Sequence, residues 1–130
     1  MSLRLVYIAI FGVTGVLARY YFGLFVEKHF HSPLPLATFC INISGAFLIG
    51  IVYVFGIERS ALSIDLRVGI MVGLLGGFTT FSSYCLEAVN LSEAKEIMYA
   101  LAYLGISPLL GFASTFAGMI LARKLLGGEL

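Results

Sequence analysis

The sequence predicts an all-α membrane protein with four transmembrane helices, and three observations support this prediction. Of its 130 residues, 60% are hydrophobic and 12% are charged, and the mean hydropathy is +1.02; a soluble domain of this size could not bury so much apolar surface. The apolar residues form four stretches, each close to the ~20 residues that a helix needs to cross ~30 Å of hydrocarbon. The segments between these stretches are short and polar. We therefore predict one domain, residues 1–130, with spans at about 5–26, 36–57, 68–89 and 97–121.

The first span combines small residues with a basic side chain inside the apolar stretch. Gly12 and Gly15 are three residues apart, so they share a helix face that another helix can approach closely. Arg19 follows four residues later and lies about two turns before the end of the span. Its guanidinium could snorkel to the interface, pair with Glu27 or Glu87, or line a vestibule that attracts anions. The sequence leaves these alternatives open.

The second span places three polar or small residues, Thr38, Asn42 and Gly45, on one helix face. Asn42 is the residue that most needs a partner, because an unpaired amide in hydrocarbon costs on the order of several kcal/mol. Its side chain must therefore face protein or a pore. The two interpretations are a hydrogen bond that joins helices and a donor in an ion pathway.

The third span is interrupted by polar residues and is predicted to be broken in the middle of the membrane. The pair Gly76–Gly77 lowers the stability of a helix. Hydroxyl side chains follow directly and can satisfy the backbone groups that a break exposes; they are Thr79, Thr80, Ser82 and Ser83. A break of this kind is tolerated only where protein or a water-filled path surrounds it.

A break at this position would also create a cation site and an aromatic face. Freed carbonyls, for instance those of Gly76 and Thr79, offer hard oxygen ligands to a small cation such as Na⁺. Phe78, Phe81 and Tyr84 follow at spacings of three residues, which predicts that their rings share one face.

The fourth span carries a narrow polar track. Tyr103, Ser107, Gly111 and Thr115 recur every four residues. This track could line an ion route or could be a packing seam of small residues. Pro108 is predicted to kink the helix and to free a backbone carbonyl near Ser107.

Other residues exclude several classes of function. The net charge is +1 and the eight basic residues are scattered, so there is no basic stripe for nucleic acid. Cys40 and Cys85 lie within spans, where packing is their simplest role. His29 and His31 lie in a polar connection without the converging ligands of a metal site. The sequence also lacks a nucleophile and base pair and a phosphate-binding loop, so we expect no enzyme activity.

The distribution of basic residues predicts cytoplasmic termini. The end of the bundle that holds both termini carries more basic residues than the other end, and the positive-inside rule assigns that end to the cytoplasm. These residues are Arg4, Arg59, Arg67, Arg123 and Lys124, against Lys28 and Lys95 at the other end.

Four motifs, in order, resemble those of the Fluc family of small bacterial fluoride channels, also called CrcB. They are Gly-x-x-Gly-x-x-x-Arg-Tyr at 12–20, Thr-Phe-x-x-Asn-x-x-Gly-x-Phe at 38–47, Gly-Gly-Phe-Thr-Thr-Phe-Ser at 76–82 and Tyr-x-x-x-Ser at 103–107. The third motif is highly specific, and the resemblance covers nearly the whole chain.

The resemblance implies a passive, fluoride-selective channel in the cell membrane that exports fluoride from the cytoplasm and relieves its toxicity. It further implies an antiparallel homodimer whose subunits insert in both orientations in the lipid bilayer. A structural Na⁺ that is not transported would lie at the dimer centre.

The resemblance also implies roles for particular residues. Asn42 would donate its amide to fluoride, Phe81 would offer a ring edge, and the carbonyls of Gly76 and Thr79 would hold Na⁺. The usual second Phe of the fluoride-lining pair is here Tyr84, whose hydroxyl could donate to an anion or disturb packing. The remaining pathway residues would be Thr80, Ser82, Ser83, Tyr103 and Ser107, with Arg19, Thr38 and Glu87 in the vestibule or in structural roles.

Two other classes of membrane protein are alternatives to a channel. A small proton-coupled drug exporter needs a titratable carboxylate deep in the first span, whereas Glu27 lies at its end and Glu87 lies late in the third span. A non-transporting membrane subunit, in which Asn42 and the glycines only join helices, remains compatible with the composition.

Overall fold

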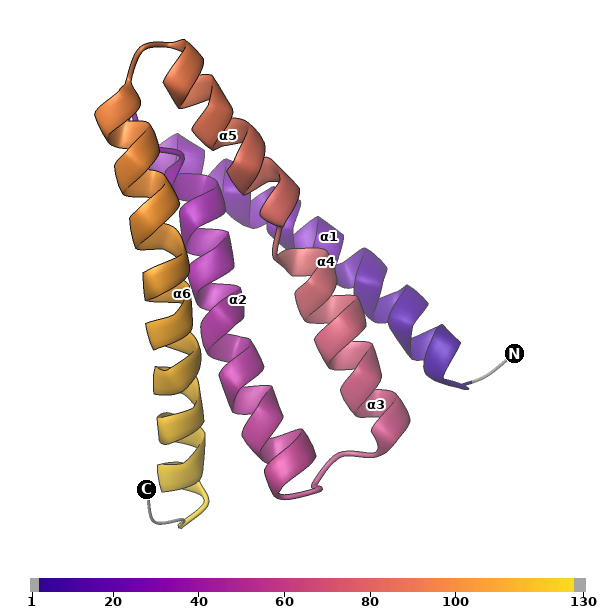
Figure 1. Ribbon diagram of the computed structural model, residues 1–130. Helices are drawn as coiled ribbons and strands as arrows, with labels where there is room; N and C mark the ends of the chain where they lie inside the picture. Colours follow the sequence, from indigo (N-terminus) through magenta and orange to yellow (C-terminus); the bar gives the residue numbers. More distant parts are fainter. Residues whose placement is uncertain (1–2, 128–130) are drawn as a thin grey trace.

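The computed structural model describes residues 3–127 and contains four membrane-length helical spans (Figure 1). The prediction of an all-α membrane protein with four spans is therefore confirmed. The spans are α1 (Leu3–His29), α2 (Leu36–Tyr53) with its π-helical continuation η1 (Val54–Glu58), the composite third span α3 (Ile64–Val68), η2 (Gly69–Leu75), α4 (Gly76–Phe78) and α5 (Phe81–Glu93), and α6 (Ile97–Leu125).

Successive spans run in opposite directions. The connection between α2 and α3 lies toward the same end of the bundle as the start of α1 and the end of α6, and the other two connections lie at the opposite end (Figure 1). α6 packs along α2, and α1 packs along η2 and α4. The bundle therefore consists of two closely packed helix pairs.

The α2–α6 pair is held together at two glycines. A Cβ atom added to Gly50 would lie 2.2 Å from the carbonyl oxygen of Thr115, and one added to Gly118 would lie 2.1 Å from the carbonyl oxygen of Phe47. Only glycine allows the two backbones to approach this closely. The fourth span therefore uses part of its length as a packing seam.

Glycines also bring α1 close to the third span. A Cβ atom on Gly15 would lie 2.1 Å from the carbonyl oxygen of Leu74, and one on Gly77 would lie 2.8 Å from that of Gly12. The predicted close approach at Gly12 and Gly15 is confirmed. Gly77 serves this contact with α1 and stays helical, so its role differs from the predicted one of weakening the helix.

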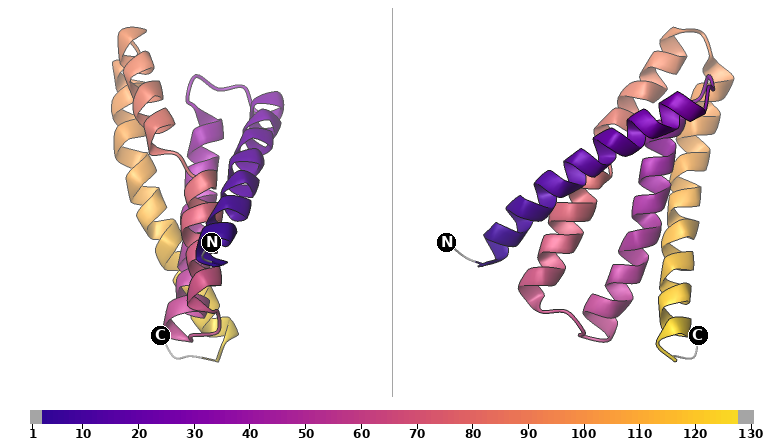
Figure 2. Two further views of the ribbon diagram at one scale, coloured as in Figure 1. Left: turned by 90° about the vertical axis from the view of Figure 1, so that its right-hand side faces the viewer. Right: turned by 180° about the vertical axis from the view of Figure 1, so that it is seen from behind.

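The predicted break in the third span is confirmed and lies at Thr79–Thr80, just after the glycine pair. Both residues are extended, with φ/ψ of −78°/158° at Thr79 and −148°/119° at Thr80. The half before the break, η2 and α4, packs on α1, whereas α5 after the break packs mainly on α6. Figure 2 shows α5 running beside α6 and away from the lower half of the span. The third span therefore packs on α1 before the break and on α6 after it.

Candidate ion site at the broken third span

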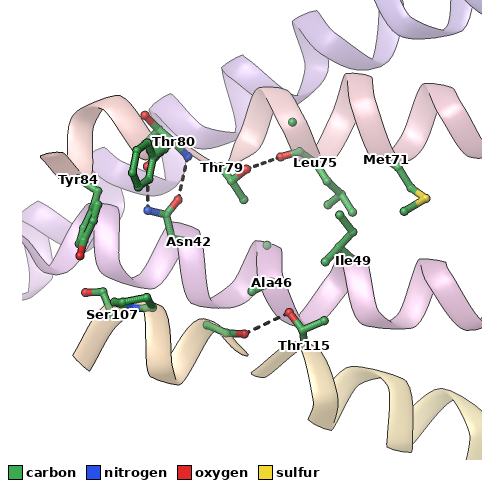
Figure 3. A pocket seen from close by; sticks show the side chains of 15 residues that line it. Asn42, Ala46, Ile49, Met71, Leu75, Thr79, Thr80, Tyr84, Ser107 and Thr115 are labelled. Atoms are coloured by element: carbon green, nitrogen blue, oxygen red, sulfur yellow. Dashed lines mark hydrogen bonds between the residues drawn. The ribbon is translucent and has the colours of Figure 1, made fainter. Parts of the chain in front are cut away.

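The break is stabilised by Asn42 from α2. Its Nδ2 donates to the carbonyl oxygen of Thr80 at 2.8 Å, and the Thr80 backbone N–H donates to its Oδ1 at 2.8 Å (Figure 3). One side-chain amide therefore satisfies both backbone groups of Thr80, which is 8% exposed. Of the two interpretations of Asn42, the structure shows the bond between helices directly. One amide hydrogen of Nδ2 is left over for another acceptor.

The hydroxyls of the polar run cap the two half-helices. Thr80 Oγ1 accepts from the backbone N–H of Ser83 at 3.3 Å and donates to Ser83 Oγ at 3.0 Å, as an N-cap of α5. Thr79 Oγ1 donates to the carbonyl of Leu75 at 2.9 Å. As predicted, a hydroxyl side chain satisfies a backbone group at the break, namely Thr80 at the N–H of Ser83; the Leu75 carbonyl already accepts from the Thr79 backbone N–H at 2.9 Å. Ser83 acts in this cap, and Ser82 is exposed on α5.

Two backbone carbonyls at the break differ from those in a continuous helix. The Thr80 N–H donates to Asn42, so the Gly76 carbonyl loses the partner that an α-helix would give it four residues on. The Thr79 carbonyl lies 3.5 Å from Nη1 of Arg19. The structure thus places the Arg19 guanidinium at the break. It shows no pairing with Glu87, one of the predicted alternatives, because the two oxygens of Glu87 accept from Thr38 and Tyr103.

A cavity of about 390 Å³ lies beside the break, between α2, the third span and α6. Figure 3 shows Asn42, Thr80, Tyr84 and Ser107 at one end of it. Within residues 3–127, the Ser107 Oγ is buried and has no hydrogen-bond partner. Eleven of the residues singled out in the sequence line this cavity: Asn42, Gly45, Gly76, Thr79, Thr80, Phe81, Tyr84, Ser107, Pro108, Gly111 and Thr115.

The aromatic residues do not share one face, contrary to the spacing argument. Phe78 precedes the break, and its ring packs against Phe22 of α1 with a centroid distance of 6.1 Å. Phe81 and Tyr84 follow the break and lie 5.8 Å apart. The extended residues between Phe78 and Phe81 change the helical phase, so only the second pair lines the cavity. The Phe81 side chain is 77% exposed.

Tyr84 uses its hydroxyl within the chain. The hydroxyl donates to the backbone carbonyl of Leu104 in α6 at 2.8 Å, and the residue is only 8% exposed. The ring lies 5.0 Å from that of Tyr103. The hydroxyl therefore supports packing between α5 and α6.

Glu87 joins three spans through its carboxylate. Thr38 Oγ1 of α2 donates to Oε1 at 2.6 Å, and the Tyr103 hydroxyl of α6 donates to Oε2 at 2.8 Å. Thr38 and Tyr103 are 6% and 4% exposed. Tyr103 thus lies apart from the larger cavity and lines, with Ser107, a second one of about 110 Å³. The predicted track on α6 is divided between two environments.

We expect Tyr103→Phe to lower stability, because it leaves one oxygen of the half-buried Glu87 carboxylate without its donor. The loss should be about 1.5–3 kcal/mol, the range for a hydrogen bond to a charged group. Thermal unfolding in detergent measures it. Tyr99→Phe is the control, since Tyr99 lies on the same helix and is 42% exposed; equal melting temperatures for the two variants would contradict the prediction.

One interhelical contact was missed in the sequence. Ser114 Oγ of α6 donates to the carbonyl of Ile43 in α2 at 3.0 Å. Ser114 is seven residues after Ser107, so both lie on one helix face. This spacing could have predicted that Ser114 also faces a neighbouring helix.

The fold and the site together define a small multi-pass membrane protein whose third span is broken beside a polar cavity. The family model described as CrcB-like protein, Camphor Resistance (CrcB), matches residues 6–119. The chain belongs to this family.

Similar proteins cover almost the whole chain. The fluoride-specific ion channel FluC of Geotalea uraniireducens (strain Rf4) is 40% identical over 119 residues, which are 92% of this chain and 96% of the relative. The protein of the same name from Citrifermentans bemidjiense is 37% identical over 122 residues, 94% of this chain and 98% of the relative. That of Flavobacterium psychrophilum is 36% identical over 119 residues, 92% and 96% of the two chains.

Proposed function

We propose that this protein is a fluoride-selective channel that lets fluoride leave the cytoplasm passively and so relieves fluoride toxicity. The observation that carries the proposal is the similarity, over 92% of the chain, to a protein named as a fluoride-specific ion channel. The match also covers 96% of that relative.

The chemistry of the cavity supports conduction of a small anion. Fluoride is tightly hydrated, so a pathway must replace its water with several donors that hold it only moderately. Asn42 has an amide hydrogen beyond its bond to Thr80, and Ser107 has a buried hydroxyl with no partner in residues 3–127. The positive edge of the Phe81 ring adds a further weak attraction. All three groups are neutral, which favours release as well as entry.

The other residues predicted for the pathway and its vestibule stabilise the structure around the cavity. Thr80, Ser82 and Ser83 form or adjoin the cap that holds the break. Thr38, Glu87 and Tyr103 form a hydrogen-bonded cluster next to the pathway end that contains Ser107. A carboxylate whose two oxygens both accept hydrogen bonds favours a fixed role for Glu87 over proton coupling.

We further propose that a second copy covers the cavity as an antiparallel homodimer. An exposed apolar side chain such as Phe81 could simply face lipid, but the backbone carbonyl of Gly76, an exposed residue at the break, could not. The open side of the cavity therefore needs a protein partner, and an inverted copy would bring an identical polar face.

A structural Na⁺ fits the same arrangement. The Gly76 carbonyl lacks its helical partner, and the Thr79 carbonyl has only the long contact of 3.5 Å with Arg19. Carbonyl oxygens of this kind suit a hard monovalent cation. Gly76 and Thr79 from each of two copies would hold the ion, whose charge would attract anions to the adjacent pathways.

Fluoride efflux from liposomes tests the proposed function. Purified protein, shown to be dimeric by mass photometry, is reconstituted into vesicles loaded with potassium fluoride, and valinomycin collapses the membrane potential. A fluoride electrode should record rapid efflux, while matched chloride-loaded vesicles lose little chloride. Vesicles without protein provide the leak control. Absence of fluoride efflux from dimeric protein would overturn the channel proposal.

The same vesicles test the sodium site. Preparing the protein and the vesicles with N-methylglucamine in place of Na⁺ should reduce fluoride efflux, and returning Na⁺ should restore it. Full efflux after exhaustive removal of Na⁺ would contradict a structural role for this ion while leaving the channel function intact.

A further inference from the structure

We propose that the Tyr84 hydroxyl replaces the backbone donor that Pro108 removes from α6, and that this bond positions Ser107 in the ion pathway. The inference rests on the proposed function. It assigns a positioning role to Tyr84.

The first step concerns the proline. Pro108 lies inside α6, which continues as an α-helix from Ile97 to Leu125. Proline has no backbone N–H, so the carbonyl four residues earlier loses its helical partner. That carbonyl belongs to Leu104. It lies within a membrane-spanning segment, where an unsatisfied carbonyl is costly because no bulk water can reach it.

The second step concerns the donor. The Tyr84 hydroxyl donates to this same Leu104 carbonyl at 2.8 Å. Tyr84 is 8% exposed, and its ring is fixed between those of Phe81 and Tyr103, at 5.8 and 5.0 Å. A phenylalanine here would retain the ring contacts and lose the donor. The hydroxyl thus supplies the hydrogen bond that Pro108 cannot.

The third step connects this bond to the pathway. Tyr84 and Ser107 line the same cavity and lie close together in Figure 3. Ser107 directly precedes Pro108, so the bond to Leu104 fixes the helical turn that carries the Ser107 hydroxyl. The single hydrogen of the Tyr84 hydroxyl is committed to α6, so toward an anion this residue presents a ring edge, as phenylalanine would.

A double-mutant cycle tests the proposal with single-channel fluoride currents in planar bilayers, which do not depend on how much protein is folded. Tyr84→Phe should lower the unitary current by about threefold or more, since the unsatisfied carbonyl distorts the Ser107 turn. Pro108→Ala restores an N–H that can donate to Leu104. In the Pro108→Ala background, Tyr84→Phe should therefore change the current by less than about 1.5-fold.

Leu109→Ala is the matched control for the rescue. Leu109 adjoins Pro108 and is 70% exposed, and its replacement gives no donor to Leu104; it should leave the Tyr84→Phe defect unchanged. A wild-type current in Tyr84→Phe, or a defect that persists beside Pro108→Ala, would overturn the proposal.

The cycle also separates this proposal from the proposed function. If wild-type protein carries no fluoride current, the channel function fails, and the same four proteins are compared by melting temperature. A loss in Tyr84→Phe that disappears with Pro108→Ala would still establish the hydrogen-bond replacement; equal losses in both backgrounds would overturn it. If Tyr84→Phe fails to assemble, assembly of the double variant supports the proposal and its failure contradicts it.

Discussion

Replacing Asn42 with alanine is expected to abolish fluoride flux. The change removes both 2.8 Å bonds to the backbone of Thr80 and leaves a buried N–H and a buried carbonyl without partners. Each unsatisfied group costs about 1–3 kcal/mol, and the variant also loses the proposed fluoride donor. Fluoride efflux from liposomes, recorded per reconstituted dimer, measures the result.

Two variants separate the effects of this substitution. Ser44→Ala is the control on α2, because the Ser44 hydroxyl bonds only to carbonyls of its own helix, and it should conduct normally. Phe81→Ile should reduce flux with little loss of stability, since Phe81 is 77% exposed within the chain. Normal flux through folded, dimeric Asn42→Ala and Phe81→Ile proteins would remove both residues from the pathway.

Gly118→Ala is expected to separate α6 from α2 and to lower the stability of the protein strongly. The new Cβ would lie 2.1 Å from the carbonyl oxygen of Phe47. This neighbour is backbone and cannot move aside without shifting a helix. Overpacking in a fixed contact costs about 1–3 kcal/mol and occasionally more, and we expect the upper end here. Thermal unfolding in detergent and the fraction of dimer after purification measure the loss.

The control for this prediction lies on the same helix. A Cβ atom on Gly105 would meet nothing within 4 Å in the described part of the chain, so Gly105→Ala should unfold at or slightly above the wild-type temperature, because alanine has the higher helix propensity. Similar behaviour of the two alanine variants would show that the α2–α6 crossing is not as close as the structure indicates.

Asn42→Ala and Gly118→Ala affect different parts of the structure. The glycine crossings fix the helix pairs, while Asn42 and the hydroxyls hold a break between them. Because the break moves α5 from the α1 side to α6, it brings Tyr84 and Phe81 to the cavity that Ser107 also lines. A rigid frame thus surrounds a short irregular segment, which is where backbone carbonyls can serve an ion in a membrane.

The sequence by itself determined the four spans, the break in the third span and the need of Asn42 for a partner. These features follow from local properties, namely apolar length, helix-breaking composition and the cost of an isolated amide in hydrocarbon. The four motifs also identified the family from the sequence alone.

Only the tertiary structure decided which groups meet. It placed the break at Thr79–Thr80, paired Asn42 with Thr80, joined Glu87 to Thr38 and Tyr103, and directed the Tyr84 hydroxyl to Leu104. The sequence spacing wrongly grouped Phe78 with Phe81 and Tyr84, because two extended residues shift the helical phase. Such contacts depend on where helices distant in sequence cross, and the glycines that set those crossings act through backbone proximity that no local pattern records.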